Sequence, residues 1–380
     1  MSDGAPDGPL TVGIPAEVKD DERRVALTPD GVRELRSHGV PVLVEAGAGL
    51  GASITDEAYQ TGGAEIVDTA AEVWARADLV CKVKEPQGEE LDHLRADLTV
   101  FTYLHLAAYP KVAAALCDAG TTAVAYETVM TPDGQLPLLA PMSEVAGRMA
   151  VQAGARFLEA PQGGRGVLLG GAPGVQPGQV TVIGAGNVGW SAAVIAAGMR
   201  AEVNLLDLNL DRLRTLDQLV SGRITTLASN RGTVERCVAE SDLVIGAVLV
   251  AGGRAPVVVT EAMVKTMRPG AVIVDVAIDQ GGCVETARET THHDPVYELH
   301  GVVHYCVGNI PGAVPHTSTL ALTNATLPYL AELARFGPTE ACRRDPVLAH
   351  GLNTEGGAVV NVVVAEALGV PAGTPGHRAA

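Results

Sequence analysis

The chain has 380 residues, 47% of them hydrophobic and 19% charged, and its 44 acidic against 27 basic side chains give a formal net charge of −17. A chain of this length and aliphatic content is typical of a globular protein with about two domains. The acidic balance argues against nucleic acid or an anionic membrane surface as a main partner, because both bind clustered cations.

Short β-branched runs alternate with helical patterns through the first third of the chain. The sequence predicts strands over residues 11–14, 40–44, 78–83, 98–103 and 121–125, and helices over 29–37, 56–61, 70–75 and 111–118. Strands separated by helices in this order predict a parallel sheet with helices on its faces.

A longer amphipathic helix is expected over 142–159, and a glycine-rich segment, 163–171, follows it. That segment is too apolar for a flexible tether, so we interpret it as an ordered loop at a domain boundary. A second alternating unit then predicts strands over 179–183, 202–206, 243–247, 271–276 and 302–306, and helices over 187–199, 211–219 and 261–267. A long helix over 315–336, broken near Pro328, and a final helix over 358–368 complete the pattern.

These elements predict an α/β fold of two Rossmann-like domains with mainly parallel sheets, joined by long helices. We expect the helix over 315–336 to return the chain to the first sheet. The first domain is then discontinuous, 1–138 with 315–380, and the second covers 139–314.

A glycine motif after the strand at 179–183 predicts a nucleotide site in the second domain. The motif residues are Gly184, Ala185, Gly186, Asn187, Val188 and Gly189. Gly184 permits a tight turn, Gly186 lets the backbone approach a pyrophosphate, and Gly189 permits close packing of helix on strand. The alternative is a tight turn that tolerates glycine and binds nothing.

The type of nucleotide is indicated by Asp207, which ends the next strand 18 residues after Gly189. An acidic residue there binds ribose hydroxyls and repels a 2′-phosphate, so NAD is favoured over NADP. Arg212 argues the other way, because a nearby arginine accommodates a 2′-phosphate, but Asp207 outweighs it.

Polar residues follow three strands of the first domain and one of the second. Arg24, Lys84 and His105 come after the strands at 11–14, 78–83 and 98–103. An arginine binds carboxylates, a lysine polarises a carbonyl and a histidine transfers protons near neutral pH, although each alone is more often a solvated or structural residue. Asp275 and Asp279 end an apolar strand, where burial could raise a pKa or an aspartate could simply form a turn.

With these residues in order, the sequence resembles the alanine dehydrogenases, a branch of the family shared with the soluble nucleotide-binding subunit of proton-translocating transhydrogenase. The resemblance covers about residues 12–371. It rests on the segments LVCKVKEP, FTYLHLA, VIGAGNVG, DLVIGAVLV, VDVAIDQGGC and YCVGNIPGAVPHTST.

The resemblance implies a role for each matching residue. Arg24 resembles the arginine that holds the substrate carboxylate, Lys84 the substrate-binding lysine, and His105 the catalytic acid and base. Asp279 resembles the carboxylate that acts with that histidine. The implied NAD contacts are Ser143, Asp207, Arg212, Ser229, Val248, Leu249, Val307 and Asn309. The family fold implies a homohexamer whose subunits have a substrate-binding domain, an NAD-binding domain and an active site in the cleft between them.

The implied reaction is the reversible oxidative deamination of L-alanine, with NAD as the hydride acceptor. Two alternatives stay open. A transhydrogenase subunit would require a membrane partner and has no use for Arg24, Lys84 and His105. A protein that senses NADH without turnover should have lost those groups. Selectivity among alanine, glycine, serine and glyoxylate also stays open, because it depends on pocket size.

The cysteines and the N-terminus indicate the compartment. The six cysteines form no CxxC pair, and no His, Cys or carboxylate spacing indicates a metal site. The N-terminus is acidic and lacks the apolar segment of a signal peptide, and no apolar run approaches the roughly 20 residues of a membrane span. We therefore expect a soluble, cytoplasmic protein without a membrane partner.

Lysine is rare, with five residues among the 27 basic side chains. In such a chain a lysine is expected where a compact ammonium does what a guanidinium cannot. We therefore expect Lys84→Arg to impair catalysis, and we expect Lys82→Arg to be tolerated as its structural control.

Overall fold

The structure is a computed structural model that describes residues 8–219, 222–248 and 255–375. The chain divides into two compact units, Met1–Met142 with Val314–Ala380, and Ser143–Ala313. None of the helices within the described ranges has both the length and the apolar character that crossing a bilayer requires.

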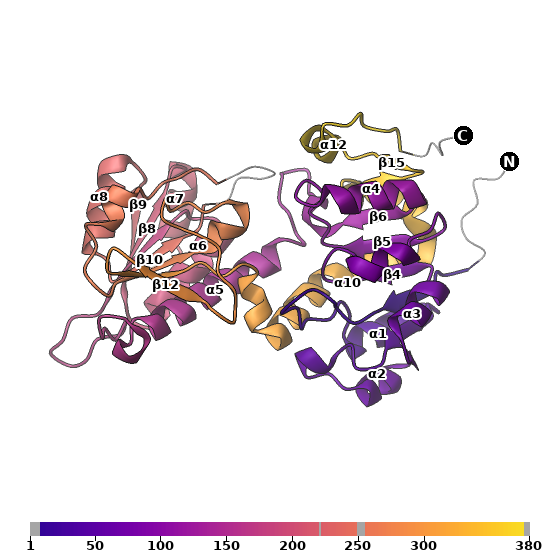
Figure 1. The fold of residues 1–380 in the computed structure, drawn as a ribbon, viewed down its shortest axis with the longest axis horizontal. Helices are drawn as coiled ribbons and strands as arrows, with labels where there is room; N and C mark the ends of the chain where they lie inside the picture. Colours follow the sequence, from indigo (N-terminus) through magenta and orange to yellow (C-terminus); the bar gives the residue numbers. More distant parts are fainter. Residues whose placement is uncertain (1–7, 220–221, 249–254, 376–380) are drawn as a thin grey trace. The chain divides into compact units, whose positions relative to one another are not determined.

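The first unit contains an eight-stranded sheet in the order β15-β14-β6-β5-β4-β1-β2-β3. Figure 1 shows β15, β6, β5 and β4 of this sheet in that order from top to bottom. The strands β1 to β6 are parallel, and β14 and β15 add an antiparallel edge. The strands are β1 (Val12–Ile14), β2 (Val42–Glu45), β3 (Glu65–Val67), β4 (Leu79–Cys81), β5 (Thr99–Thr102), β6 (Thr122–Ala125), β14 (Leu352–Glu355) and β15 (Ala358–Val359).

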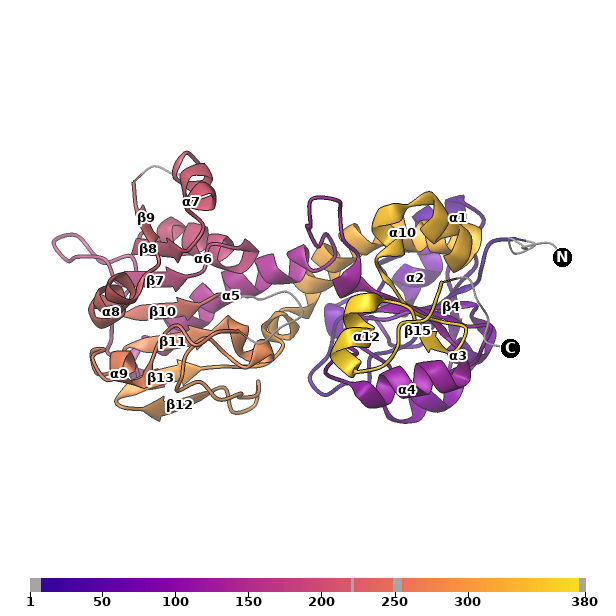
Figure 2. The same ribbon diagram turned by 90° about the horizontal axis from the view of Figure 1, so that it is seen from above.

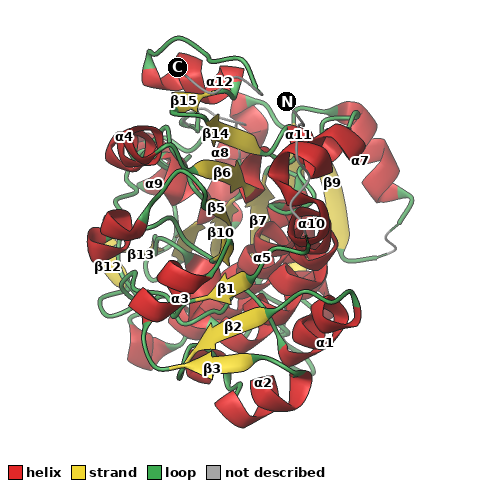
Figure 3. Ribbon diagram, turned by 90° about the vertical axis from the view of Figure 1, so that its right-hand side faces the viewer, coloured by secondary structure: helices red, strands yellow, loops and turns green. Residues whose placement is uncertain are grey.

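Helices cover both faces of this sheet, with α1 and α10 on one face and α3 and α4 on the other (Figures 2 and 3). Threonines begin several of these helices: the hydroxyls of Thr28, Thr55 and Thr69 accept from backbone N–H groups in the first turns of α1, α2 and α3. The helices are α1 (Pro29–Ser37), α2 (Asp56–Gly62), α3 (Ala70–Arg76), α4 (Pro110–Ala119), α10 (Pro315–Arg344), α11 (Pro346–Ala349) and α12 (Val362–Leu368), with 3-10 turns η1 (Leu50–Ala52), η2 (Gly88–His93) and η3 (Tyr126–Thr128).

The second unit contains a seven-stranded sheet in the order β12-β13-β11-β10-β7-β8-β9. All neighbours are parallel except β12, which pairs antiparallel with β13. The strands are β7 (Gln179–Ile183), β8 (Glu202–Asp207), β9 (Ile224–Ala228), β10 (Leu243–Gly246), β11 (Val272–Asp275), β12 (Val296–Leu299) and β13 (Val302–Tyr305).

Alternate strand residues supply two cores in this unit. Val180 and Val182 of β7 pack in one core with α5, α6 and α7, whereas Ile183 packs in the other with α8 and α9. Strands buried on both faces explain why these segments are almost entirely apolar. The helices are α5 (Ala140–Phe157), α6 (Asn187–Gly198), α7 (Leu210–Asp217), α8 (Arg231–Glu240) and α9 (Glu261–Val264), with 3-10 turns η4 (Ala160–Gln162), η5 (Val276–Gln280) and η6 (Ile310–Ala313).

The predicted fold class is confirmed, because both units are layered α/β structures with mainly parallel sheets. The predicted break near Pro328 is wrong, because α10 continues through Pro328 and departs from helical geometry at Gly337, whose φ is 73°. Gly337 precedes Pro338, and a proline disfavours the helical conformation of the residue before it while glycine accepts a positive φ.

Two further expectations are corrected. The predicted final helix over 358–368 begins only at Val362, because β14 and β15 form a hairpin through Gly356 and Gly357, which both have positive φ. The glycine-rich segment 163–171 is an ordered loop, with Arg165 N bonded to Gly270 O at 2.9 Å. It lies inside the second unit, however, and not at a boundary.

Candidate active site

The order of strands reverses between β1 and β4 in the first unit. From β1 the chain continues to β2 and β3 on one side, and from β4 to β5 and β6 on the other. Open parallel sheets bind ligands beyond the carboxyl ends of their strands at such a reversal. Arg24, Lys84 and His105 follow β1, β4 and β5, so the predicted substrate residues lie at the same edge of the sheet.

Arg24 is buried, and Glu22 holds its guanidinium. The Nε of Arg24 donates to Glu22 Oε1 at 2.7 Å, its Nη2 donates to Oε2 at 2.5 Å, and its Nη1 lies 3.0 Å from the Sδ of Met142. Burial opposes the ionisation of Glu22, but hydrogen bonds and charge from Arg24, with the charge of Lys84, hold the pKa of Glu22 at about 2. The pair is therefore ionised at neutral pH, and Lys84 is close enough to act on Glu22 electrostatically.

His105 has an unusual backbone conformation, with a φ of 46°. Its N–H donates to Glu127 Oε1 at 2.6 Å, and the N–H of Leu104 donates to Glu127 Oε2 at 3.2 Å. The imidazole stacks on the ring of Tyr103 at 5.7 Å between centroids, and its Nδ1 lies 3.9 Å from Glu127 Oε1. Left-handed backbone at a non-glycine residue is concentrated at functional sites, so this geometry supports a role for His105.

Lys82 is not suited to be the structural control for Lys84, because it is buried among charged groups. Its side chain is fully buried, and its Nζ lies 2.7 Å from Glu90 Oε1 and 3.3 Å from Glu17 Oε2. These contacts are ion pairs rather than well-aligned hydrogen bonds. Because a guanidinium is larger than an ammonium and the position is fully buried, we now expect Lys82→Arg to be destabilising, so Lys82 does not serve as a control. Lys265, which is about half exposed at the C-terminal cap of α9, is the better control.

The second unit has its own strand reversal, between β7 and β10. The glycine motif follows β7, Asp207 ends β8, Ser229 follows β9 and Val248 follows β10, so these predicted nucleotide residues share one edge of the second sheet. The backbone connects two of them, because Ser229 N donates to Asp207 O at 2.9 Å.

The three glycines of the motif have the distinct environments that a nucleotide cradle requires. Gly184 has a φ of 98°, and a Cβ there would lie 2.5 Å from the carbonyl oxygen of Ala247. At Gly189 a Cβ would lie 1.7 Å from the carbonyl oxygen of Gly184, whereas at Gly186 it would meet no atom within 4 Å. The open space beside Gly186 lies at the N-terminus of α6. It fits a pyrophosphate that would accept hydrogen bonds from the N–H groups of Asn187 and Val188.

Asp207 holds the turn of this motif. Its Oδ2 accepts from Ala185 N at 2.7 Å and its Oδ1 accepts from Asn209 N at 2.7 Å, while Arg212 Nη1 lies 3.9 Å from Oδ2. The carboxylate is partly exposed and retains acceptor capacity for ribose hydroxyls, since a carboxylate offers about four lone-pair sites. Arg212 is paired with this carboxylate, which reduces its availability for a 2′-phosphate.

The two aspartates after β11 have different environments. Asp275 is buried and accepts from the backbone N–H groups of Ala277, Cys283 and Val284 at 2.9–3.0 Å, and burial raises its pKa despite these bonds. It is therefore a turn-forming residue. Asp279 is exposed on η5, and its Oδ1 accepts from Asn309 N at 3.3 Å.

The remaining predicted nucleotide contacts differ in backbone conformation and in exposure to solvent. Asn309 has a φ of 56° and, like His105, is one of six non-glycine residues with a positive φ among the described residues. Val307 is completely buried in the core, so only its backbone can meet a ligand. Ser143 is partly exposed on α5. Leu249 lies outside the described residues.

Sequence reasoning missed the carboxylates that hold these groups, namely Glu17, Glu22 and Glu127. Glu17 accepts from Val83 N at 2.6 Å and from Lys84 N at 3.2 Å. Glu127 comes two residues after β6, so the rule that polar groups gather after parallel strands would have found it. Glu22 lies two residues before Arg24, which is also a usable signal, but no local pattern connects Glu17 to Lys84.

Comparison with known proteins identifies relatives over nearly the whole chain. Family models described as "Alanine dehydrogenase/PNT, N-terminal domain" and "Alanine dehydrogenase/PNT, C-terminal domain" match residues 13–146 and 150–362. Alanine dehydrogenase of Mycobacterium tuberculosis is 56% identical over 362 residues, which is 95% of this chain and 98% of that protein.

Two solved structures, one from each branch of the family that the sequence resembles, are similar to this fold. An L-alanine dehydrogenase superposes with a TM-score of 0.92 and 50% identity, over 94% of this chain and 99% of the other. A transhydrogenase from Sinorhizobium meliloti superposes with a TM-score of 0.79 and 28% identity, over 93% of this chain and 99% of the other. The similarity is therefore greater to the dehydrogenase in both sequence and backbone.

Proposed function

The chain belongs to the alanine dehydrogenase/PNT family, and from this premise we propose that it is an alanine dehydrogenase that uses NAD. The reaction converts L-alanine, NAD⁺ and water into pyruvate, NADH, ammonium and a proton, and it is reversible. What supports the proposal is the placement of Arg24, Lys84 and His105 after β1, β4 and β5, at one edge of the sheet, because a hydride exchange between nucleotides has no use for these groups.

Arg24 is proposed to bind the substrate carboxylate. Glu22 fixes the guanidinium plane through Nε and Nη2, so the plane is set before substrate arrives and little orientational entropy is lost on binding. Lys84 is proposed to contact the carboxylate and the carbonyl oxygen of pyruvate, where a compact ammonium polarises the carbonyl. Together the two cations orient the reacting carbon, which is mainly a proximity effect.

His105 is proposed as the acid and base, and Asp279 as the carboxylate that supports it. Oxidation of the C–N bond leaves an imine, and water adds to it to give a carbinolamine that releases ammonia. His105 first accepts a proton from the substrate ammonium and then moves protons between water and the leaving nitrogen. Its backbone, fixed by Glu127, holds the ring in one place through these transfers.

NAD, when bound, supplies the hydride acceptor. We propose that Gly184, Gly186 and Gly189 shape its pyrophosphate site and that Asp207 accepts from the ribose hydroxyls. The contacts proposed from the resemblance are completed by Ser143, Asn187, Val188, Arg212, Ser229, Val248, Leu249, Val307 and Asn309. Pairing of Arg212 with Asp207 supports NAD over NADP.

The transhydrogenase subunit is the second candidate, favoured by the 28% identical structure from Sinorhizobium meliloti. The higher identity to alanine dehydrogenases supports the dehydrogenase, as does the placement of Arg24, Lys84 and His105 at one edge of the first sheet. The same residues argue against a sensor without turnover. The six cysteines are all free thiols, which supports the cytoplasm as the proposed compartment.

The decisive experiment is to mix the purified chain with L-alanine and NAD at alkaline pH and to follow NADH absorbance. We expect NADH to form, and we expect His105→Ala to lower kcat by roughly 10²–10⁴. His38→Ala is the matched control, since His38 lies at the surface end of α1 and should change nothing. Absence of NADH with the wild-type chain would refute the proposal, and full activity of His105→Ala would remove His105 from the mechanism.

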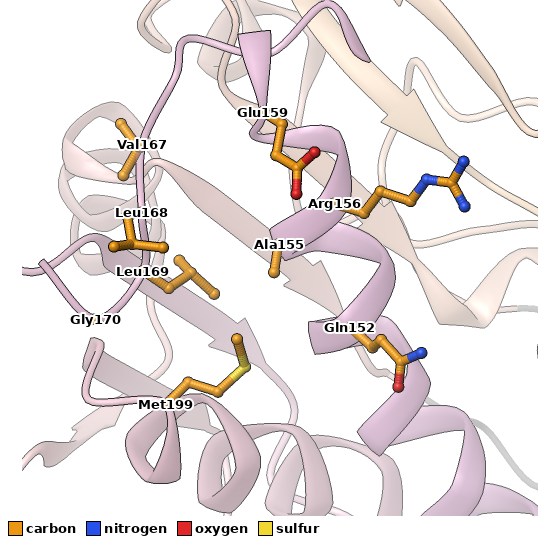
Figure 4. A pocket seen from close by; sticks show the side chains of 9 residues that line it. All are labelled: Gln152, Ala155, Arg156, Glu159, Val167, Leu168, Leu169, Gly170 and Met199. Carbon is orange, nitrogen blue, oxygen red and sulfur yellow. The ribbon is translucent and has the colours of Figure 1, made fainter. Parts of the chain in front are cut away.

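We also propose that the chain forms a homo-oligomer, a hexamer by resemblance. Support comes from an open hollow of about 460 Å³ on the second unit, between α5, the loop at 167–170 and Met199 (Figure 4). Its lining is mostly apolar, and Leu168 is 72% exposed. Exposed apolar surface of this kind marks contact sites, so a second copy of the chain is the proposed occupant.

A further inference from the structure

Three buried charges beside the proposed substrate cations have no part in the reaction as written. Lys82 is fully buried, and the side chains of Glu17 and Glu90 are 2% and 6% exposed. Buried charges are costly unless they are paired, and their retention requires a reason. The reason lies in what Glu17 does with its remaining hydrogen-bonding capacity.

Glu17 holds the backbone that carries Lys84. The strand β4 ends at Cys81, and Lys82 N still pairs with Phe101 O at 3.1 Å. The next two N–H groups bond to the carboxylate instead: Val83 N donates to Glu17 Oε1 at 2.6 Å, and Lys84 N donates to Glu17 Oε2 at 3.2 Å. Both oxygens of Glu17 are therefore bonded to the two amides that lead to the Lys84 side chain.

The carbonyls of the same segment are held by side chains too. Tyr126 Oη donates to Lys82 O at 2.9 Å, and Thr102 Oγ1 donates to Lys84 O at 2.9 Å. The segment is thus fixed on both sides after the regular strand ends. Lys82 folds back so that its ammonium faces Glu17 Oε2, which fixes the carboxylate in turn.

We propose that Glu17, held by buried Lys82, is the positioning residue that sets the place of the Lys84 ammonium. This inference rests on the proposed function, in which Lys84 contacts the substrate. Only a carboxylate suits the position, because it presents acceptors to two amide donors and an ammonium at once. A glutamine has one oxygen, and its NH₂ would face either an N–H group or the ammonium of Lys82.

The test compares Glu17→Gln with Asp78→Asn. Asp78 is a matched control because its Oδ2 accepts from Thr11 N at 2.8 Å, at the end of β4 opposite to Lys84. We expect Glu17→Gln to lower kcat/KM for pyruvate by about tenfold to a hundredfold while KM for NADH is unchanged, since small misplacement of a positioning group has effects of this size. Asp78→Asn should retain wild-type kinetics.

A second readout observes the lysine directly. With only five lysines, reductive ¹³C-methylation gives a simple NMR spectrum in which Lys84→Arg identifies the Lys84 signal. We expect that signal to move in Glu17→Gln and to lose its response to added pyruvate. If Glu17→Gln does not fold, Glu17→Asp keeps the charge beside Lys82 but withdraws it from the amides, and the same changes are expected.

The outcomes separate the two claims. A wild-type chain that does not oxidise alanine contradicts the proposed function, while the Lys84 signal still decides whether Glu17 sets its environment. Wild-type kinetics and an unmoved Lys84 signal in Glu17→Gln or Glu17→Asp would overturn the inference. An equal loss in Glu17→Gln and Asp78→Asn would overturn it as well, because it would indicate a general effect on the sheet.

Discussion

Three of the five lysines follow the neighbouring strands β1 and β4, and each interacts with a carboxylate. Lys19 Nζ lies 2.7 Å from Glu85 Oε1, Lys82 lies between Glu17 and Glu90, and the charge of Lys84 helps to lower the pKa of Glu22. A compact ammonium with three donors fits between carboxylates where a planar guanidinium would not. The scarcity of lysine elsewhere makes this concentration a property of the site.

Glu22 gives the site a pH-dependent contribution to stability. Its pKa is about 2 in the folded chain against 4.5 for the unperturbed group, so folding favours the ionised form. The stabilisation is complete above the unfolded value and is lost as the pH falls from 4.5 through about 2. We expect Glu22→Gln to lower the free energy of unfolding by about 3 kcal/mol near neutral pH, because it leaves Arg24 buried without its partner.

The measurement is urea unfolding of the wild type and of Glu22→Gln at neutral pH and at about pH 3. The difference between the two proteins should shrink at the lower pH. Glu34→Gln is the control, because Glu34 forms only a surface pair with His38 on α1 and should change stability little. A difference that stays the same at both pH values would show that Glu22 acts by packing and not by charge.

At the scale of the element, the turn from β7 into α6 contains one glycine needed for folding and another that we expect to be needed only for binding. A Cβ at Gly189 would lie 1.7 Å from Gly184 O, whereas one at Gly186 would meet nothing within 4 Å. We expect Gly186→Ala to leave the melting temperature unchanged but to weaken NADH binding by at least tenfold, because the added methyl occupies space meant for the pyrophosphate. Gly189→Ala should reduce both stability and binding.

Circular dichroism melting and NADH fluorescence titration provide the two readouts. Gly198→Ala at the other end of α6 is the control, since a Cβ there also meets no atom within 4 Å and lies away from the turn. Unchanged NADH binding in Gly186→Ala would place the pyrophosphate elsewhere. A loss of stability in that variant would show that the space is needed for folding.

Most of the elements that sequence reasoning identified have a clear burial pattern, although helix α8, which buries Val234, Cys237 and Val238, was missed. The strand over 179–183 is identical to β7, whose last four residues are buried. The missed strands are β3, β9, β12, β14 and β15, which lie at or beside sheet edges. Of these, β3, β9 and β12 include exposed residues. Such strands are formed by pairing with a neighbour, which a local pattern does not reveal.

The candidate site likewise contains residues that the sequence predicts and residues that it does not. Arg24, Lys84 and His105 could be predicted from the sequence, because ligand-binding residues of parallel sheets follow the strands. The resemblance then assigned their roles. The hydrogen bonds of Glu17 to the backbone at Lys84 connect residues 67 apart in the sequence, and no spacing rule reports such a pair. The burial of Lys82 could not be predicted from the sequence either, because its partners come from other segments.

At the scale of the whole molecule, an acidic chain with a net charge of −17 still presents apolar side chains on one part of its second unit. Leu168, Val175 and Met199 are 72%, 64% and 41% exposed. Leu168 and Met199 line the hollow beside α5 (Figure 4). Charge repulsion between copies opposes association, and apolar burial at this patch is the proposed source of the opposing free energy.

We therefore expect Leu168→Asp to dissociate the assembly. The wild type should have a mass that is a multiple of 39.0 kDa, six-fold for the proposed hexamer, in light scattering coupled to size-exclusion chromatography. A carboxylate introduced at the hollow adds charge where apolar surface would be buried, so the variant should elute as a smaller species. Val257→Asp is the matched control, because Val257 is 55% exposed in the same unit but does not line the hollow. A monomeric wild type, or a Leu168→Asp variant with the full oligomeric mass, would contradict the proposed contact, whereas dissociation by both variants would place the interface beyond the hollow.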